Sequence, residues 1–194
     1  MKPFEQSITS ILQKGGIGII PTDTIYGVVG RAELKETVER IYAIRNRDHT
    51  KACIVLISSY EDLEKFTVEL LPSDRDFIER HTLWPGKVSI ILPITDSRFT
   101  YLTRGTNSLA FRMPNVPELQ ELIRETGPLI APSANKEGSP HARTIRMAEV
   151  EFRDLVDFYV DGGEMNEEAS TIIRLIDGTF TLVREGAVHI SSRS

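Results

Sequence analysis

The sequence predicts a single α/β domain, and three observations lead to this class. Short apolar runs rich in β-branched residues alternate with stretches in which apolar residues recur three or four positions apart. The chain of 194 residues is long enough to bury one sizeable core. No internal repeat, low-complexity tract or Ser/Gly linker divides it. This mixed order of elements indicates helices layered on a sheet within one domain, 1–194.

The elements follow from these patterns, taken in chain order. The first helix is expected over 4–14 and ends at Gly15, a typical cap residue. A buried strand over 17–20 follows and stops at Pro21. Further helices are expected at 33–45, 72–81, 116–126 and 144–152, and strands at 53–57, 88–92, 108–112, 129–131, 157–160, 171–175 and 180–184.

Composition excludes several classes of protein. With 40% hydrophobic and 26% charged residues, the chain is neither disordered nor fibrous. No apolar run approaches 18 residues and the N-terminus lacks the pattern of a signal peptide, so we expect a cytoplasmic protein with no membrane partner. The single cysteine, Cys53, excludes an internal disulfide and a zinc site built on several cysteines. The four histidines show no metal-ligand spacing, so no metal site is expected.

Charge is unevenly distributed along the chain. The formal net charge of −5 argues against a surface that grips nucleic acid as a whole, but it leaves room for a local basic groove. The C-terminal third is acidic, above all at 161–169. This acidic stretch is either a solvated loop or a surface for a partner.

Polar side chains follow the first predicted strand. The segment Pro21-Thr22-Asp23-Thr24-Ile25-Tyr26-Gly27 places two hydroxyls, a carboxylate and a phenol at a strand end. Ligands of open α/β sheets bind beyond strand ends, which favours a binding role. The alternative is a turn in which Thr22 and Asp23 bond the local backbone.

A cluster of cations follows the second predicted helix. Arg45, Arg47 and Lys51 lie in the loop before the strand at 53–57. Arginine clamps phosphate oxygens with two parallel hydrogen bonds and lysine acts as a point charge, so the set suits a triphosphate. The alternative is a solvated charge run that favours the C-terminal end of the helix dipole.

Three later segments end or begin strands with polar residues. Ser108 and Arg112 are four apart on one face of a predicted strand, where the arginine could hold a carboxylate. Ser133 and Asn135 follow a short strand, and Thr144 suits a helix N-cap. Ser170 and Arg184 lie at the open end of a predicted hairpin that turns at Asp177-Gly178. Taken singly, all of these are also ordinary turn, cap or strand-end residues.

Together and in this order, the five segments resemble the YrdC family, whose members make threonylcarbamoyl-adenylate from threonine, bicarbonate and ATP. The resemblance spans nearly the whole chain. The segment at 21–27 is similar to the family's Pro-Thr-Glu-Thr-Val-Tyr-Gly, and the other matching motifs are Trp84-Pro85-Gly86, Arg112-Met113-Pro114, Ser133-Ala134-Asn135 and Ser170-Thr171-Ile172. The resemblance implies an open, twisted, mixed β-sheet with flanking helices and a concave basic ligand groove.

Site residues carry over from this resemblance by position. It implies a threonine site made by Thr24, Arg112, Ser133 and Ser170, with Arg112 holding the carboxylate. It implies nucleotide contacts by Arg47, Lys51, Ser108, Asn135, Thr144 and Arg184. Supporting roles fall to Thr22, Tyr26, Arg45 and Arg143, and Arg143 competes with Thr144 because the preceding loop varies in length in the family.

Two residues and the end of the chain depart from the family's pattern. Arg45 stands where the family's Lys-Gly-Arg motif usually has lysine, which retains the charge but changes its geometry. Leu56 stands where larger two-domain relatives often have a histidine. The chain ends soon after Arg184-Glu185-Gly186, so we expect the relatives' linker and second domain to be absent.

The resemblance also implies a reaction, in which the carboxylate of N-carboxythreonine attacks the α-phosphorus of ATP and expels pyrophosphate. No catalytic nucleophile or acid/base residue is assigned, because Cys53 lies inside an apolar strand and no Ser-His-Asp arrangement is present. Mg²⁺ is expected with ATP, held mainly by phosphates and water. Proteins of tRNA modification are the expected partners. A non-catalytic RNA-binding module and a carbamoyl-transfer accessory protein are the alternatives.

Overall fold

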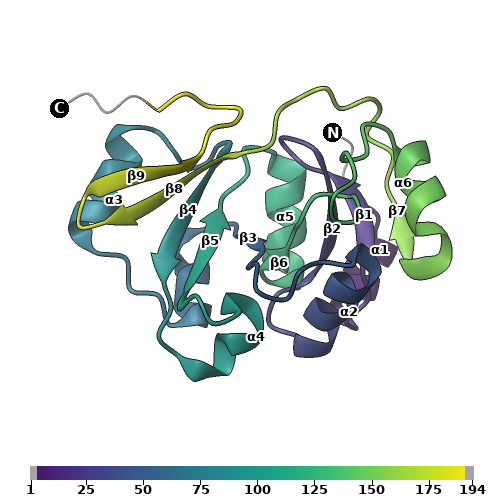
Figure 1. Ribbon diagram of the computed structural model, residues 1–194, viewed down its shortest axis with the longest axis horizontal. Helices are drawn as coiled ribbons and strands as arrows, with labels where there is room; N and C mark the ends of the chain where they lie inside the picture. The colour runs from purple at the N-terminus through teal and green to yellow at the C-terminus, as the bar shows by residue number, and fades with distance from the viewer. Residues whose placement is uncertain (1–3, 191–194) are drawn as a thin grey trace.

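The computed structural model describes residues 4–190. Its order of elements is that of a mixed α/β domain (Figure 1). The helices are α1 (Gln6–Gln13), α2 (Lys35–Arg45), α3 (Pro72–Arg80), α4 (Thr100–Thr103), α5 (Pro117–Thr126) and α6 (Ile145–Phe152), with 3₁₀ turns η1 (Tyr60–Phe66), η2 (Ser97–Phe99) and η3 (Arg153–Leu155). The strands are β1 (Gly18–Pro21), β2 (Tyr26–Arg31), β3 (Ile54–Leu56), β4 (Val88–Pro93), β5 (Ser108–Arg112), β6 (Leu129–Ile130), β7 (Phe158–Tyr159), β8 (Thr171–Ile176) and β9 (Thr179–Arg184).

The strands form one nine-stranded sheet in the order β7-β1-β2-β6-β3-β5-β4-β8-β9. Strand β1 runs parallel to β7, β3 to β5, and β4 to β8, whereas the other neighbours are antiparallel. The predicted open, mixed sheet with flanking helices is thereby confirmed. The predicted hairpin is confirmed as well, because both turn residues, Asp177 and Gly178, have positive φ and suit a two-residue connection.

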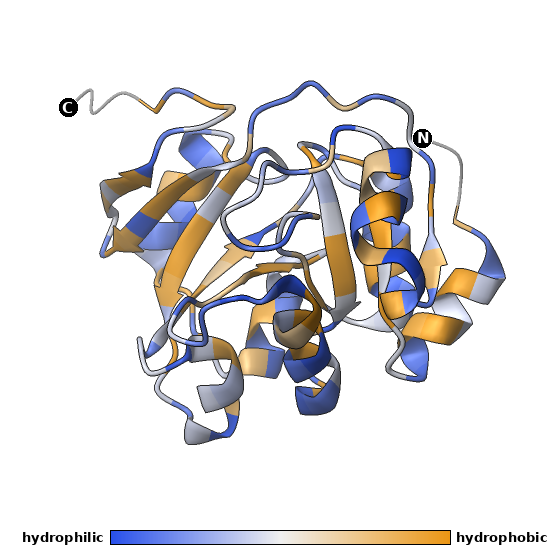
Figure 2. Ribbon diagram, turned by 45° about the vertical axis from the view of Figure 1, so that its right-hand side comes forward, coloured by the Kyte–Doolittle hydropathy of each residue, from blue (hydrophilic) through white to orange (hydrophobic). Residues whose placement is uncertain are grey.

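Two hydrophobic clusters lie on opposite faces of this sheet. Val28 and Val55 belong to the larger cluster, and their chain neighbours Val29 and Leu56 belong to the smaller. Because successive strand residues point to opposite faces, each cluster has one face to itself. Helices α1 and α5 cover the smaller cluster, and α2, α3 and α6 contribute to the larger. Figure 2 shows apolar residues concentrated on the strands inside the molecule.

The sequence patterns did not predict β2, and Gly30 explains why. Two glycines in Tyr26–Arg31 give the segment the composition of a loop. Gly30 is instead a site of close approach, since a Cβ there would lie 2.4 Å from Cγ2 of Thr37 on α2. The absence of a side chain lets helix and strand pack closely. The short turns η1, η2 and α4 were also not predicted.

Candidate functional site

A cavity of about 370 Å³ opens where the ends of several strands meet. The turn between β1 and β2, the loop after β6, the end of β5 and the open end of the β8–β9 hairpin form its walls. Many of the residues that the sequence singled out line it together: Thr22, Thr24, Tyr26, Arg47, Arg112, Ser133, Asn135, Ser170 and Arg184. Segments far apart in the chain therefore converge on one site.

Arg112 ends β5 and reaches the cavity from a buried position. Its Nη1 donates to Oγ1 of Thr24 at 3.1 Å and its Nη2 to Oγ1 of Thr22 at 3.5 Å. Oδ1 of Asp23 lies 3.2 Å from Nη2, and both side chains of this ion pair are almost wholly buried. Burial lowers the pKa of Arg112, whereas the charge of Asp23 raises it. The Nε of Arg112 is buried and has no hydrogen-bond partner among the described residues.

The segment at 21–27 forms a local turn and also contributes to the lining of the cavity. Thr22 Oγ1 donates to the carbonyl of Ile25 at 2.8 Å and accepts from the amide of Thr24 at 3.2 Å, which closes a local turn. Tyr26 turns its hydroxyl elsewhere: it accepts from the amide of Gly162 and donates to the carbonyl of Gly163, both at 2.8 Å. The threonines thus shape the cavity, and the tyrosine fastens residues 160–170, which we call the acidic strap.

Arg45 supports the loop that forms one wall of the cavity, without lining the cavity itself. This last residue of α2 is buried, and its Nη2 donates to Oγ of Ser133 at 3.2 Å and to Oδ1 of Asn135 at 3.3 Å. Burial, with a smaller contribution from the nearby charge of Arg47, lowers the pKa of Arg45 to about 10. Its Nε and Nη1 lack hydrogen-bond partners among the described residues. The loop that carries Ser133 and Asn135 is therefore held on a buried cation.

Ser170 and Arg184 meet at the open end of the hairpin, as the sequence predicted. Arg184 Nη2 donates to the carbonyl of Ser170 at 2.6 Å, and the Ser170 hydroxyl lies 2.9 Å from that of Ser89. Partial desolvation and the positive charge of Arg112 lower the pKa of Arg184. Two guanidinium groups thus approach the same space from different strands.

The cation cluster before β3 divides between two environments. Arg47 lines the cavity while its Nε and Nη2 donate to the carbonyls of Lys51 and Ala52 at 3.2 and 2.9 Å. Lys51 is exposed, lies outside the lining, and pairs closely with Glu137. An anionic ligand would have to compete with that carboxylate for Lys51.

Besides Arg45 and Lys51, three further predicted residues lie outside the lining of the cavity. Ser108 begins β5, so it lies about 13 Å along the strand from Arg112. Thr144 is the N-cap of α6 and accepts from the amide of Met147 at 3.3 Å, which is the cap role that the sequence offered as the alternative. Arg143 is exposed and pairs with Glu164 at 3.7 Å. Sharing a face with Arg112 therefore did not bring Ser108 to the cavity.

Within residues 4–190, the charged side chains in the lining are arginines, and no aspartate or glutamate joins them. A neighbouring cavity of about 430 Å³ shares His141, Ala169 and Arg184 with the first and also contacts Arg143. This neighbouring cavity is also lined by Glu167, Glu168 and Glu185, so an anionic ligand that extends into it meets carboxylates as well as arginines. The broader basic groove implied by the family resemblance stays a prediction.

Sequence patterns missed three residues of the site. Asp23 lay inside a motif, but nothing in the sequence pairs it with a residue 89 positions away. His141 lines both cavities, although its loop carries only turn signals. Cys53 lines the first cavity, and burial raises the pKa of its thiol, so the expected inert thiol stands beside the ligand space.

Neither a metal-binding cluster nor a membrane-spanning helix is present within residues 4–190. No group of three or more His, Cys, Asp or Glu side chains is arranged to hold a metal ion there. None of the helices in that range combines the length and apolar character needed to cross a bilayer.

Comparison with known proteins identifies the family of this chain. The Sua5/YciO/YrdC family model, described as telomere recombination, matches residues 10–186. Proteins named threonylcarbamoyl-AMP synthase from Bacillus subtilis and Pyrococcus abyssi are 30% and 29% identical over 182 and 181 residues, which is 92% of this chain. The chain spans only about half of their length, at 52% and 53%.

Solved structures agree with the sequence relatives. The crystal structure of P. abyssi Sua5 complexed with L-threonine superposes with a TM-score of 0.84 at 28% identity and covers 93% of this chain and 53% of that one. E. coli YciO superposes with a TM-score of 0.80 at 25% identity and covers 93% of this chain and 87% of that one. The chain belongs to the Sua5/YciO/YrdC family.

Proposed function

We propose that this chain makes L-threonylcarbamoyl-adenylate from L-threonine, bicarbonate and ATP. The threonine amine and bicarbonate give N-carboxythreonine and water. The new carboxylate attacks the α-phosphorus of ATP, a phosphorus–oxygen bond forms, and pyrophosphate leaves. The observation that carries the proposal is a cavity whose charged lining groups are arginines, with Arg112 buried at its wall. The names of the curated relatives and the threonine complex of Sua5 support the same reading.

The threonine end of the site would be the part around Arg112. The α-carboxylate of threonine would pair with the guanidinium group of Arg112, which lines the cavity. Thr24, Ser133 and Ser170 supply hydroxyls from three separate segments of the lining, which suits the hydroxyl and amine of the substrate. Hydrogen bonds from fixed, buried groups cost little reorganisation during the reaction.

The nucleotide end would extend toward the neighbouring cavity. Arg184 lines both cavities, and Arg47 lines the first. The two guanidinium groups therefore suit the phosphates of ATP. Asn135 also lines the cavity, but its side-chain amide already donates to the carbonyls of Lys136 and Ser139 and accepts from Arg45. MgATP would enter as a substrate whose metal is held by phosphate and water, because none of the described carboxylates lines the first cavity.

Catalysis in this proposal rests on positioning and charge stabilisation. No covalent intermediate is required, and the raised pKa of the Cys53 thiol makes it a poor nucleophile at neutral pH. The arginines would stabilise the charge that develops on the α-phosphate and on the leaving pyrophosphate. We further propose a cytoplasmic location and transfer of the product to tRNA by partner proteins.

The direct test is to incubate the pure protein with MgATP, labelled bicarbonate and L-threonine, and to look for labelled threonylcarbamoyl-adenylate and pyrophosphate. We expect both products only when all three substrates are present. A chain that binds RNA with a steep salt dependence and releases no pyrophosphate would support the binding-module alternative instead. Lack of product alongside an active control synthase would overturn the proposal.

A further inference from the structure

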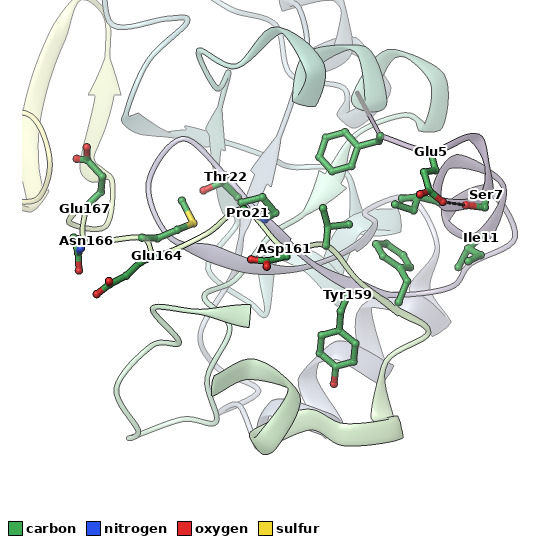
Figure 3. A pocket seen from close by; sticks show the side chains of 16 residues that line it. Glu5, Ser7, Ile11, Pro21, Thr22, Tyr159, Asp161, Glu164, Asn166 and Glu167 are labelled. Carbon is green, nitrogen blue, oxygen red and sulfur yellow. Dashed lines mark hydrogen bonds between the residues drawn. The ribbon is translucent and has the colours of Figure 1, made fainter. Parts of the chain in front are cut away.

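A second and larger hollow lies on the other side of the acidic strap. It measures about 1210 Å³, and its walls are the N-terminal part of α1, the end of β1, β7 and strap residues 160–167. It shares Thr22 with the cavity that contains Arg112, and it shares Met165, Asn166 and Glu167 with the neighbouring cavity. Figure 3 shows its lining side chains arranged between α1 and the strap. We call this hollow the strap groove, and the proposed reaction makes no use of it.

The floor of the strap groove is apolar and incompletely covered. Ile11, Phe158, Val160 and Met165 line it, and each is only partly buried. Phe158 and Val160 pack with one side against the smaller core and leave the other side toward the groove. An apolar floor with a polar rim is typical of a surface that another molecule covers.

The rim carries charge of one sign. Glu5, Asp161, Glu164 and Glu167 line the groove, and no lysine, arginine or histidine within residues 4–190 lines it. Figure 3 shows these carboxylates spread along the groove, with Glu5 at one end, Asp161 between, and Glu164 and Glu167 at the other. The complementary ligand therefore has several cations spaced along its length.

Two of these carboxylates, on Glu164 and Glu167, already pair with cations of the chain but can still bind a cation of a ligand. Glu164 pairs with Arg143 at 3.7 Å and Glu167 with Lys87 at 2.9 Å, and the two carboxylate side chains are 61% and 57% exposed. Exposed pairs of this kind contribute little free energy, so an incoming cation can replace either partner.

The size of the groove argues for a polypeptide. Sites for small molecules usually enclose roughly 300–1,000 Å³, and the strap groove is larger than that range. We propose that the strap groove is a docking surface for a cationic amphipathic segment of a partner protein, whose apolar side chains cover Phe158, Val160 and Met165 while its lysines or arginines meet the rim carboxylates. The segment would lie along α1 and the strap, as amphipathic helices lie in apolar grooves.

The strap itself is fixed well enough to serve as a wall. The hydroxyl of Tyr26 holds Gly162 and Gly163, and the amide of Met165 donates to the carbonyl of Arg143 at 2.8 Å. A Cβ on Gly162 would lie 2.5 Å from Cβ of Pro21, so the strap passes in direct contact with the end of β1. A wall held at several points presents its carboxylates in a defined arrangement.

The test uses two synthetic 14-residue peptides made only of leucine and lysine. One places its leucines three and four positions apart, and the other has the same composition with leucines on all faces. Titration of the full chain, followed by backbone amide NMR and by fluorescence anisotropy, should give shifts at 4–11 and 158–167. The first peptide should bind at least tenfold more tightly than the second.

Matched charge reversals complete the test. Glu164→Lys with Glu167→Lys should weaken binding of the first peptide at least tenfold. Asp76→Lys with Glu79→Lys changes the charge equally, and these carboxylates are also ion-paired, with 59% and 55% exposure, but they lie on α3. This control should change the affinity less than twofold, and an unchanged Tm would show that both variants fold.

Equal binding of the two peptides, equal weakening by both reversals, or shifts elsewhere on the molecule would each overturn the docking proposal. None of these outcomes bears on the synthase assay, since peptide binding is measured without substrates.

Discussion

Asp23 and Arg112 form an ion pair from which water is almost wholly excluded, with side chains 4% and 5% exposed. Removing one partner of such a pair leaves an unpaired buried charge, which typically costs about 3–5 kcal/mol. We therefore expect Asp23→Ala to lower the free energy of unfolding by about 3 kcal/mol, on that basis. The double variant Asp23→Asn/Arg112→Met should recover most of the loss. Urea unfolding measures both, and an equal loss in the two variants would contradict an electrostatic cause.

Arg112 also allows a test that keeps this pair intact. Arg112→Lys retains the positive charge but replaces a planar fork by a point charge. Loss of one charge-assisted hydrogen bond, worth about 1.5–3 kcal/mol, predicts that L-threonine binds roughly 10- to 100-fold more weakly. ATP affinity should change by less than about threefold, because Arg47 and Arg184 remain. Calorimetric titration measures both, and Arg174→Lys on the exposed side of β8 is the matched control. Unchanged threonine affinity would remove Arg112 from the site.

The convergence of side chains on the cavity could be predicted from the sequence where they sit at strand ends, whereas their roles in binding stay predictions. Arg112, Ser133 and Ser170 all end or flank strands, and the fold brings them together. It failed for Ser108, because alternation along a strand reports the face but not the position along that face. The pairing of Asp23 with Arg112 depends on long-range folding, which local patterns do not contain.

At the scale of elements, the acidic strap has no regular secondary structure and depends on a few anchors. Tyr26→Phe removes a hydroxyl that makes two hydrogen bonds of 2.8 Å to the strap. Each such bond is worth about 1 kcal/mol, so we expect a loss of about 1–2 kcal/mol in local stability. Hydrogen exchange at the Gly162 amide should accelerate about 5- to 30-fold, while amides of α5 stay unchanged. Equal acceleration throughout the chain would indicate global destabilisation instead.

Asp157 joins three elements and gives the fold a dependence on pH. Its carboxylate accepts two hydrogen bonds from Arg40 on α2, at 2.7 and 3.0 Å, and one from the amide of Ile17 at 2.8 Å. The Arg40 bonds, followed by the Ile17 bond, hold the pKa of Asp157 below its ordinary value. This stabilisation is therefore present above the unfolded pKa of about 3.9 and is lost as the pH falls through the folded value.

Replacing this carboxylate should flatten the acid response. We expect the Tm of the unmodified chain to fall more steeply between pH 5 and 3 than the Tm of Asp157→Asn, which cannot lose a charge there. Asp154→Asn, on the neighbouring exposed turn η3, is a suitable control and should follow the unmodified chain. Parallel curves for all three proteins would show that Asp157 does not govern this range.

Most elements could be predicted because their signals are local. Glycine marked the end of α1, and prolines stand at the first position of α3 and α5. Strand β2 could not be predicted, since the two glycines in it signal a loop and their packing role becomes visible only beside α2. The 3₁₀ turns carry no strong period of their own.

At the scale of the molecule, one sheet joins two cores, which predicts a single unfolding transition. Ile90 lies wholly buried in the larger cluster and Leu122 is buried in the smaller. Substituting either by alanine should cost about 2–5 kcal/mol. Both variants should shift the same urea midpoint with an unchanged m-value. Val150→Ala, at a side chain 69% exposed, should change the stability by less than about 0.5 kcal/mol. Separate transitions in the two variants would contradict a single cooperative domain.

The strand order shows what local patterns leave undetermined at this scale. The fold class and the order of elements along the chain follow from the alternation of helix and strand patterns. In the sheet, however, β6 lies between β2 and β3 although it follows both in the chain. Such an arrangement rests on pairings between distant residues. The convergence of the site segments is a consequence of that order, so the site as a whole became visible only with the fold.

The acidic strap contacts both hollows with one continuous piece of chain. Its Met165 and Asn166 face the strap groove, and its Ala169 and Ser170 line the cavity that contains Arg112. Suppose that a bound segment shifts the equilibrium position of the strap and thereby changes the affinity for threonine by some factor. Thermodynamic reciprocity then requires threonine to change the affinity for that segment by the same factor. Repeating the peptide titration with saturating threonine present would measure this coupling as a change in the affinity for the peptide.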